Sequence, residues 1–152
     1  MASLISLNPH YPEPYLIGQA ADAIRKGGVA VIPTDTVYAI VCSAERPRGA
    51  QLLYRLKGPA GTAAGKPLSV LFHDLSTVAE YTRGIPNIAY KVMKRVLPGP
   101  YTLILSASKR LPSAALQGRK TIGVRIPDNE VTQALLEALG EPLLSTSVYH
   151  HE

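Results

Sequence analysis

The stretch "GGVAVIPTDTVYAI", residues 27–40, decides the fold class of this chain. Its two glycines favour the end of a helix, and residues 15–26 before them, "YLIGQAADAIRK", carry apolar side chains on one helical stripe. Residues 29–33, "VAVIP", are an apolar run between Gly and Pro, which is typical of a short buried strand. A helix that leads directly into a buried strand predicts a sheet with helices packed on it.

Helical and strand-like segments alternate along the rest of the chain. This alternation predicts the α/β or α+β class, with an open, twisted, mixed sheet flanked by helices. The last strand has nothing regular after it, so we expect it either at a sheet edge that needs covering or in a truncated form of the fold. The further predicted helices are residues 49–58, 85–99 and 131–140, and the further predicted strands are residues 66–72, 101–107, 121–127 and 142–147.

The predicted helix 85–99 has one apolar and one basic side. Its apolar residues recur at helical spacing, which predicts that they face the core. The basic residues are left for the outer face. The apolar set is Ile85, Ile88, Ala89, Val92, Met93 and Val96, and the basic set is Lys91, Lys94 and Arg95.

The composition favours a folded chain with an anionic partner. With 152 residues, the length predicts a single domain, residues 1–152. Lys and Arg number 16 against 11 Asp and Glu, so the formal net charge is +5. This balance favours a nucleotide or a nucleic acid as partner through long-range attraction, and solubility alone explains it equally well.

Several protein classes are not expected from this sequence. No stretch reaches the roughly 18 uninterrupted apolar residues that a membrane span needs. The first residues lack the basic region of a secretory signal, so we expect a cytoplasmic protein that binds no membrane. The single Cys42 excludes an internal disulfide and a cysteine metal cluster, and a buried structural thiol explains it better than a nucleophile.

Thr34, Asp35 and Thr36 place two hydroxyls and a carboxylate where a predicted strand ends. Side chains at strand ends open into the crevice beyond a sheet, where ligands commonly bind. The alternative is turn chemistry, in which Thr and Asp side chains accept hydrogen bonds from nearby backbone amides. Both interpretations stay open from this stretch alone.

Residues 56–68, "LKGPAGTAAGKPL", resemble a phosphate loop but do not match the Walker pattern. The position five before Gly65 is Ala60, and Pro67 after Lys66 has no hydroxyl for a metal. Lys57 and Lys66 flank a predicted flexible loop of small residues, where a backbone can approach an anion closely. An ordinary surface loop with solvated lysines is the alternative.

Two further segments carry polar groups inside apolar strands. Arg125 lies between Val124 and Ile126, so its guanidinium must pair with a carboxylate of the protein or reach a ligand. Ser145 and Ser147 fall on one face of a predicted strand, with a polar ligand or cross-strand hydrogen bonds as the alternatives. Adjacent His150 and His151 have no spacing suited to a metal, and we expect them to be solvated and no protein metal site to form.

Five blocks in order resemble the YrdC-like threonylcarbamoyl-adenylate synthase family. The similarity runs from about Ile17 to Ser147, and the wording of several blocks is similar to the YciO branch. It implies an open α/β fold with a large cavity over a twisted sheet, and a single domain, residues 1–152, that lacks the family's C-terminal portion. The blocks are "GGVAVIPTDTVYAI", "LKG…KPLSVL", "LPGPYTLIL", "TIGVRIPDN" and "EPLLSTS".

The resemblance also implies a reaction and a set of site residues. Synthases of this family convert L-threonine, bicarbonate and ATP to threonylcarbamoyl-adenylate and pyrophosphate, for N6-threonylcarbamoyladenosine in tRNA, with Mg²⁺ expected on the phosphates. A carbamate oxygen attacks the α-phosphate, so alignment and positive charge are what the enzyme supplies. The implied threonine-binding residues are Thr36, Arg125 and Ser145, the implied nucleotide-binding residues are Lys57, Lys66, Thr121 and Ser147, and the implied catalytic cations are Lys57 and Arg125.

The chain departs from the family pattern in ways that predict impaired activity. The arginine of the family's K-x-R is Pro59, so Lys66 would have to supply that charge. The asparagine of its S-x-N is Tyr149, and its glycine after P-T-D-T-x-Y is Ala39. A histidine that follows K-P-L in the family is Leu71, with His73 two positions on.

The rival hypothesis is a binding module without catalysis. The resemblance implies a basic concave surface associated with double-stranded RNA or tRNA. Such a module would bind RNA with a steep salt dependence and without any effect of ATP. A degenerate member that binds no ligand is the third alternative.

Overall fold

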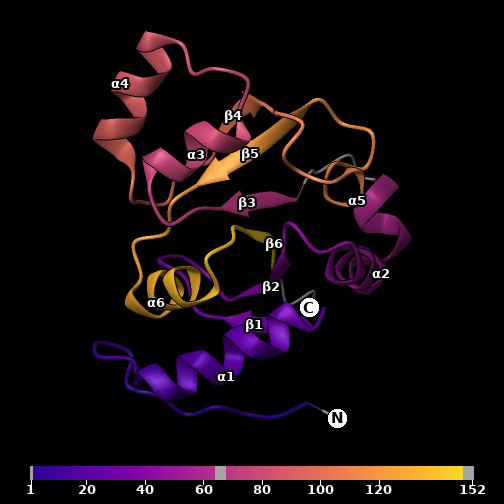
Figure 1. The fold of residues 1–152 in the computed structure, drawn as a ribbon, viewed down its shortest axis with the longest axis vertical. Helices are drawn as coiled ribbons and strands as arrows, with labels where there is room; N and C mark the ends of the chain where they lie inside the picture. The colour runs from indigo at the N-terminus through magenta and orange to yellow at the C-terminus, as the bar shows by residue number, and fades with distance from the viewer. Residues whose placement is uncertain (1, 64–67, 149–152) are drawn as a thin grey trace.

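The computed structural model describes residues 2–63 and 68–148, with the backbone alone for residues 58–63. The described strands form one six-stranded sheet in the order β1-β2-β6-β3-β5-β4 (Figure 1). Strands β3 and β5 pair in parallel, and every other described pair is antiparallel. The strands are β1 (Ala30–Ile32), β2 (Ala39–Ser43), β3 (Ser69–Leu71), β4 (Leu103–Ser106), β5 (Thr121–Arg125) and β6 (Leu143–Ser147).

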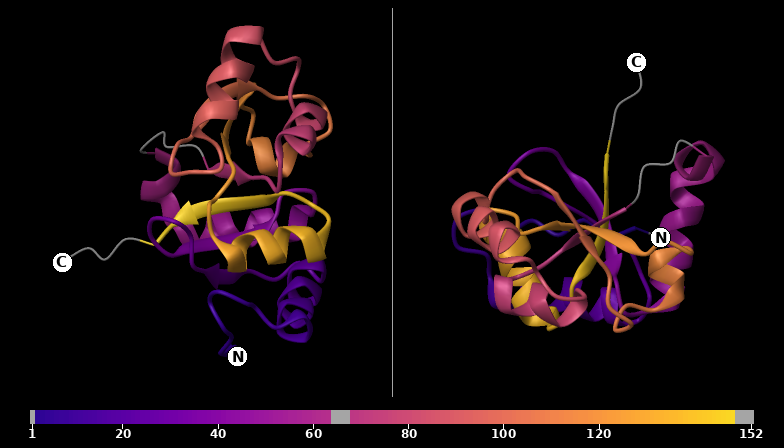
Figure 2. Two further views of the ribbon diagram at one scale, coloured as in Figure 1. Left: turned by 90° about the vertical axis from the view of Figure 1, so that its left-hand side faces the viewer. Right: turned by 90° about the horizontal axis from the view of Figure 1, so that it is seen from above.

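Helices cover both faces of the sheet. The first and last helices pack against each other on one face, and Figure 1 shows them beside the β1 end of the sheet. The helices are α1 (Pro14–Arg25), α2 (Pro47–Ala63), α3 (Leu75–Tyr81), α4 (Asn87–Val96), α5 (Ser113–Leu116) and α6 (Glu130–Leu139). Buried residues of the helices other than α1 and α6 form a separate hydrophobic cluster, and the right-hand view of Figure 2 shows α2 and α5 across the sheet from the yellow α6.

Two hydrophobic cores follow from the alternation of side chains along the strands. Val41, Leu71 and Leu143 pack with α1 and α6, whereas the residues that follow them in the chain pack on the other face. Because both faces are apolar over the middle strands, these strands are buried on both sides. The mixed, helix-flanked sheet predicted from the sequence is therefore confirmed.

Glycine signals located the helix ends correctly. Gly140 ends α6 with a φ of 71°, a left-handed conformation that favours glycine, and its amide donates to the carbonyl of Leu136. Gly27, with a φ of 89°, follows α1 in the same way. The short helices α3 and α5 were not predicted, because four to seven residues give too little periodicity to recognise.

Helix α2 corrects the prediction of a loop between Lys57 and Lys66. The helix continues to Ala63, so Lys57 lies on a helix and the segment through Pro59 is helical. Gly and Pro lower helix propensity, but packing decides: Leu53 is fully buried, and the Tyr54 hydroxyl donates to the Ala115 carbonyl of α5 at 3.0 Å. Lys66 lies outside the described residues.

The last strand also differs from its prediction. Strand β6 lies between β2 and β3, in the middle of the sheet, so of the two alternatives given for it the edge strand is wrong. Two antiparallel neighbours, rather than a following element, satisfy its backbone. The described edges are β1 and β4.

Helix α4 only partly matches its predicted core side. Met93 is buried, but Ile88 and Val92 are 80% and 44% exposed. The helix projects at the end of the sheet near β4 (Figure 1), so only a narrow side of it meets the core. Its basic residues are exposed as predicted.

Candidate functional site

The loop between β1 and β2 carries the first predicted site residues. The chain leaves β1 at Ile32 and turns through Thr34, Asp35 and Thr36 before β2 begins. The Thr34 hydroxyl accepts a hydrogen bond from the Thr36 amide at 3.1 Å and donates to the Val37 carbonyl at 2.6 Å. The predicted turn chemistry is therefore confirmed for Thr34, whereas the Asp35 carboxylate accepts from the Arg125 side chain.

Two side chains at the start of α6 bind the loop between β1 and β2. The Thr132 hydroxyl donates to the Pro33 carbonyl at 2.6 Å, and the Asn129 side-chain amide donates to the Thr34 carbonyl at 3.4 Å. Asn129 also caps α6 by accepting from the amides of Val131 and Thr132. Asn129 thus both caps the helix and, with Thr132, positions the loop.

Arg125 ends β5 with its guanidinium against this loop. Its Nη2 donates to the Asp35 carboxylate and, at 3.1 Å, to the Thr36 hydroxyl. Both members of the ion pair are largely buried, with side-chain exposures of 13% for Arg125 and 11% for Asp35. The structural ion pair considered for Arg125 is present, and its partner lies 90 residues earlier in the chain.

A row of small residues crosses the sheet beside this pair. Ser145 of β6 pairs with Ser69 of β3, which pairs with Gly123 of β5, two residues before Arg125. By strand alternation these side chains lie on the same face as Arg125. A Cβ at Gly123 would lie 2.9 Å from Thr102 Cγ2 and 3.6 Å from Ser69 Oγ, so glycine keeps space open in this row.

The remaining predicted residues lie farther along the same face or outside it. Ser147 shares its face with Ser145, as predicted, and pairs with Ala39 of β2. Thr121 is exposed at the start of β5, about 13 Å of strand from Arg125. Lys57 lies on α2, on the other side of the sheet from α6. The structure thus joins Thr36 with Arg125, and a cavity shared by Arg125 and Lys57 stays a prediction.

Sequence reasoning missed four residues that build this region. They contribute a strand hydroxyl, a glycine that leaves space, a helix cap and a hydroxyl that holds the loop. Asn129, directly before an apolar helix, is a recognisable helix-cap signal, whereas no local sequence pattern indicates the roles of the other three residues. They are Ser69, Gly123, Asn129 and Thr132.

Two hollows among the described residues lie apart from these groups. One, of about 500 Å³, opens beyond the carboxyl ends of β3 and β5. The other, of about 300 Å³, lies between the end of α1 and the start of α2. Neither is lined by a predicted site residue; the first is bounded by groups that include His73, Asp74, Leu97, Pro98, Ile126 and Gln133.

Chemically, the region around Arg125 suits a carboxylate with a nearby hydroxyl. A guanidinium offers paired N–H groups that match two carboxylate oxygens, and burial strengthens such a contact. The hydroxyls of Thr36 and Ser145 can donate or accept hydrogen bonds around it. The described residues include no cluster of three or more His, Cys, Asp or Glu that could hold a metal ion, and no described helix is long and apolar enough to span a bilayer.

Comparison with known proteins finds a matching family and several similar sequences. The family described as Sua5/YciO/YrdC, "Telomere recombination", matches residues 22–152. The chain is 42% identical to "Uncharacterized protein YciO" of Escherichia coli over 149 residues, 97% of this chain and 70% of that protein. It is 34% identical to human "Threonylcarbamoyl-AMP synthase" over 128 residues, 84% of this chain and 44% of the synthase.

Solved structures agree with the fold described above. The crystal structure of E. coli YciO superposes with a TM-score of 0.88 at 41% identity, over 97% of this chain and 70% of YciO. P. abyssi Sua5 in complex with L-threonine superposes with a TM-score of 0.83 at 30% identity, over 90% of this chain and 39% of Sua5. The open mixed sheet with flanking helices is therefore common to all three.

Proposed function

Because the chain belongs to the Sua5/YciO/YrdC family, we propose that it binds L-threonine and ATP and forms threonylcarbamoyl-adenylate from threonine, bicarbonate and ATP. The product would serve tRNA modification to N6-threonylcarbamoyladenosine. Support comes from the relatives called threonylcarbamoyl-AMP synthase and from the threonine complex of P. abyssi Sua5. Each of these relatives is only partly covered by this chain.

The single observation that carries the proposal is the contact between Arg125 and Thr36. Two residues 89 apart in the chain, both implied as threonine ligands, meet at 3.1 Å on the face that also carries Ser145. In the proposal, Arg125 binds the threonine carboxylate through its paired N–H groups, and the two hydroxyls orient the amino acid. Holding the substrate in one orientation is what aligns its carbamate oxygen with the α-phosphate.

The nucleotide side of the proposal rests on residues on both sides of the sheet. Lys57 and Lys66 would neutralise phosphate charge, and Thr121 and Ser147 would bind the nucleotide through their hydroxyls. Attack of the carbamate oxygen on the α-phosphate forms the mixed anhydride, and pyrophosphate leaves with the electrons of the broken P–O bond. Pro59 in place of the family's arginine removes one cation from this set, which predicts a slow reaction.

Mg²⁺ would enter with the nucleotide rather than occupy a preformed protein site. This ion keeps most of its water and usually binds one or two carboxylates together with substrate phosphates. The carboxylate of Asp35 is already engaged with Arg125. The metal would supply charge neutralisation on the triphosphate, and no residue described here is assigned to it.

The test measures pyrophosphate release by the purified chain. The proposal expects pyrophosphate release that requires both L-threonine and bicarbonate and that falls at least tenfold in Lys57→Ala. Arg125→Lys keeps the positive charge but loses the paired N–H donors of the guanidinium, so the KM for threonine rises. Lys91→Ala and Arg95→Lys, exposed on α4, are the matched controls and leave release unchanged. Release that does not depend on threonine and bicarbonate contradicts the proposal.

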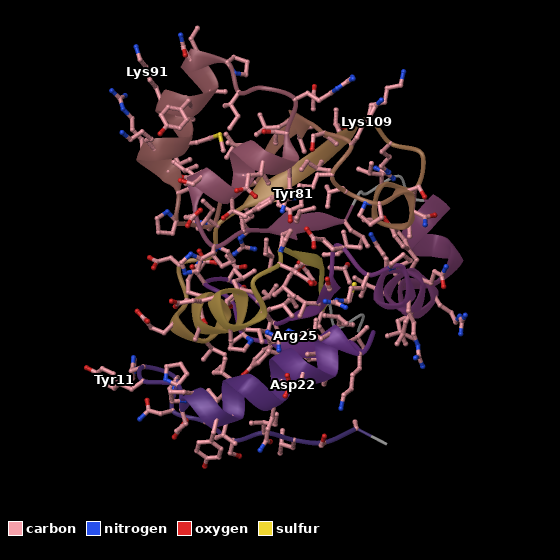
Figure 3. All side chains as sticks on the ribbon, viewed as in Figure 1. Tyr11, Asp22, Arg25, Tyr81, Lys91 and Lys109 are labelled. Carbon is pink, nitrogen blue, oxygen red and sulfur yellow. The ribbon has the colours of Figure 1, made fainter. Side chains whose placement is uncertain are left out.

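A second candidate, RNA binding, is favoured by one feature. Helix α4 exposes Lys91, Lys94 and Arg95 on a part of the molecule that projects from the sheet, and Lys91 lies on its outer side (Figure 3). In this candidate, these cations contact phosphates of tRNA or double-stranded RNA. Binding would weaken steeply with salt, would be reduced by Lys91→Ala and would not respond to ATP.

A further inference from the structure

The ion pair between Asp35 and Arg125 uses one oxygen of the carboxylate and one nitrogen of the guanidinium. Asp35 Oδ1 accepts from Nη2 of Arg125, which also donates to Thr36. Asp35 Oδ2 and Arg125 Nε are both buried and have no hydrogen-bond partner among the described residues. A carboxylate and a guanidinium can form two parallel hydrogen bonds, so this pair is monodentate where a bidentate contact is available.

Because two buried atoms stay unsatisfied in the described part of the chain, the Asp35 carboxylate binds Arg125 less favourably than a carboxylate that forms two hydrogen bonds with the guanidinium. A buried donor or acceptor without a partner has lost its hydrogen bonds to water and gained none from the protein, so it destabilises the pair. The Asp35 backbone cannot shift to satisfy both atoms, because its neighbours in the loop are held by α6 and by the turn that Thr34 makes. A carboxylate that is not tied to this loop can approach Nη2 and Nε together.

Arg125 is also held by contacts that do not involve Asp35. Its backbone is part of β5, and its carbonyl accepts from the Phe72 amide at 2.9 Å. Its Nη2 keeps the hydrogen bond to the Thr36 hydroxyl. Displacement of Asp35 therefore requires only a rotation of its side chain about its own bonds, with the loop backbone and the guanidinium left in place.

We infer that Asp35 occupies the place of the substrate carboxylate on Arg125 and is displaced by it, so that Asp35 sets the affinity and the carboxylate requirement of the amino-acid site. The inference rests on the proposed threonine binding. Asp35 acts here as an internal competitor, in contrast to a residue that would bind the substrate's ammonium group. The two roles predict opposite effects of removing its charge.

The decisive variant is Asp35→Asn, which keeps the shape and one acceptor but loses the charge. Displacing a neutral amide costs less than displacing a carboxylate, so the dissociation constant for L-threonine, measured by calorimetry, falls about tenfold. Binding of L-threoninamide, which lacks the carboxylate, does not improve. Asp128→Asn, an exposed carboxylate three residues after Arg125, is the control and leaves threonine affinity unchanged.

The outcomes separate this inference from the proposed function. If the wild-type chain binds threonine and Asp35→Asn binds it equally or more weakly, the inference is wrong and threonine binding stands. If Asp128→Asn gives the same gain, a general field effect explains it and the inference is again wrong. If no folded variant binds threonine, both are overturned.

A measurement on the unaltered chain covers the case in which Asp35→Asn does not fold. Threonine must then change the carbon-13 NMR shift of the Asp35 carboxyl group, because the inference moves that group from a guanidinium to solvent. An unchanged carboxyl resonance in a chain saturated with threonine overturns the inference.

Discussion

Arg46 and Glu141 form an ion pair with 2.6 Å between Nη2 and Oε1, which joins the start of α2 to the turn before β6. The Ser43 hydroxyl at the end of β2 donates to the other carboxylate oxygen at 2.5 Å. Burial alone would raise the pKa of Glu141, but the hydrogen bonds from Arg46 and Ser43 and the charge of Arg46 together hold it below its usual range. The carboxylate of Glu141 thus links the end of β2, the start of α2 and the turn before β6.

Replacement of this carboxylate tests that link. Folding lowers the pKa of Glu141. Its ionised carboxylate therefore adds to the free energy of unfolding above the unfolded pKa of about 4.3, and this contribution is lost as pH falls through the folded pKa. Glu141→Gln therefore lowers the free energy of unfolding by about 1–2 kcal/mol at pH 7, and the difference shrinks below about pH 4. Urea denaturation at several pH values measures it. Glu137→Gln, exposed on α6, is the control, and an equal loss there contradicts the assignment.

Tyr81 of α3 makes two separable contacts. Its hydroxyl donates to the Glu45 carboxylate, and the Arg110 guanidinium lies 4.8 Å from its ring centre. Tyr81→Phe keeps the ring and leaves a part-buried acceptor, so we expect a loss of about 1–2 kcal/mol in the free energy of unfolding. Tyr81→Leu also loses the ring and its packing on Phe72, so we expect about 3 kcal/mol. Thermal denaturation of both variants measures the two steps, and equal losses would show that the hydroxyl alone matters.

Gly123 keeps space open in the row that contains Ser69. In Gly123→Ala the new Cβ lies 2.9 Å from Thr102 Cγ2, so we expect a loss of about 1–2 kcal/mol in the free energy of unfolding. Thr102→Ser removes that methyl group, and the double variant should recover most of the loss. Urea denaturation of the two single variants and the double variant forms the cycle. A double variant as unstable as Gly123→Ala would place the strain elsewhere.

Cys42 is a buried thiol inside the sheet. Burial raises the pKa of this thiol to about 12, so it stays protonated at pH 8. We expect reaction with a disulfide reagent at pH 8 to be at least a hundredfold slower in the native chain than in urea. The raised pKa favours folding below the unfolded pKa of about 8.5, and this contribution is lost as pH rises further. Fast native labelling at pH 8 contradicts this account.

Local signals predicted most of the secondary structure and little of the site. Gly140 and the apolar spacing of residues 131–140 located α6, because capping and periodicity act within a few residues. The prediction of a loop after Lys57 was wrong, since packing of the first part of α2 outweighs the low propensity of Gly and Pro. Lys66 and the terminal histidines lie outside the described residues, and their predicted roles stay predictions.

The position of the last strand shows the limit of local reasoning. Residues 142–147 read correctly as a strand, but nothing within them says which strands lie beside it. Its place between β2 and β3 follows from pairing with segments about 75 and 100 residues away in the chain, and such pairing depends on the register of the whole sheet.

By itself, the sequence determined the longer helices, the strands and the family motifs, because propensity, periodicity and caps are properties of neighbouring residues. Only the tertiary structure decided that Arg125 pairs with Asp35 and that one buried polar atom on each has no hydrogen-bond partner within residues 2–63 and 68–148. The physical reason is that a buried charge pairs with whichever distant segment the sheet brings within hydrogen-bonding distance. The residues next to that charge in the chain do not indicate which segment this is.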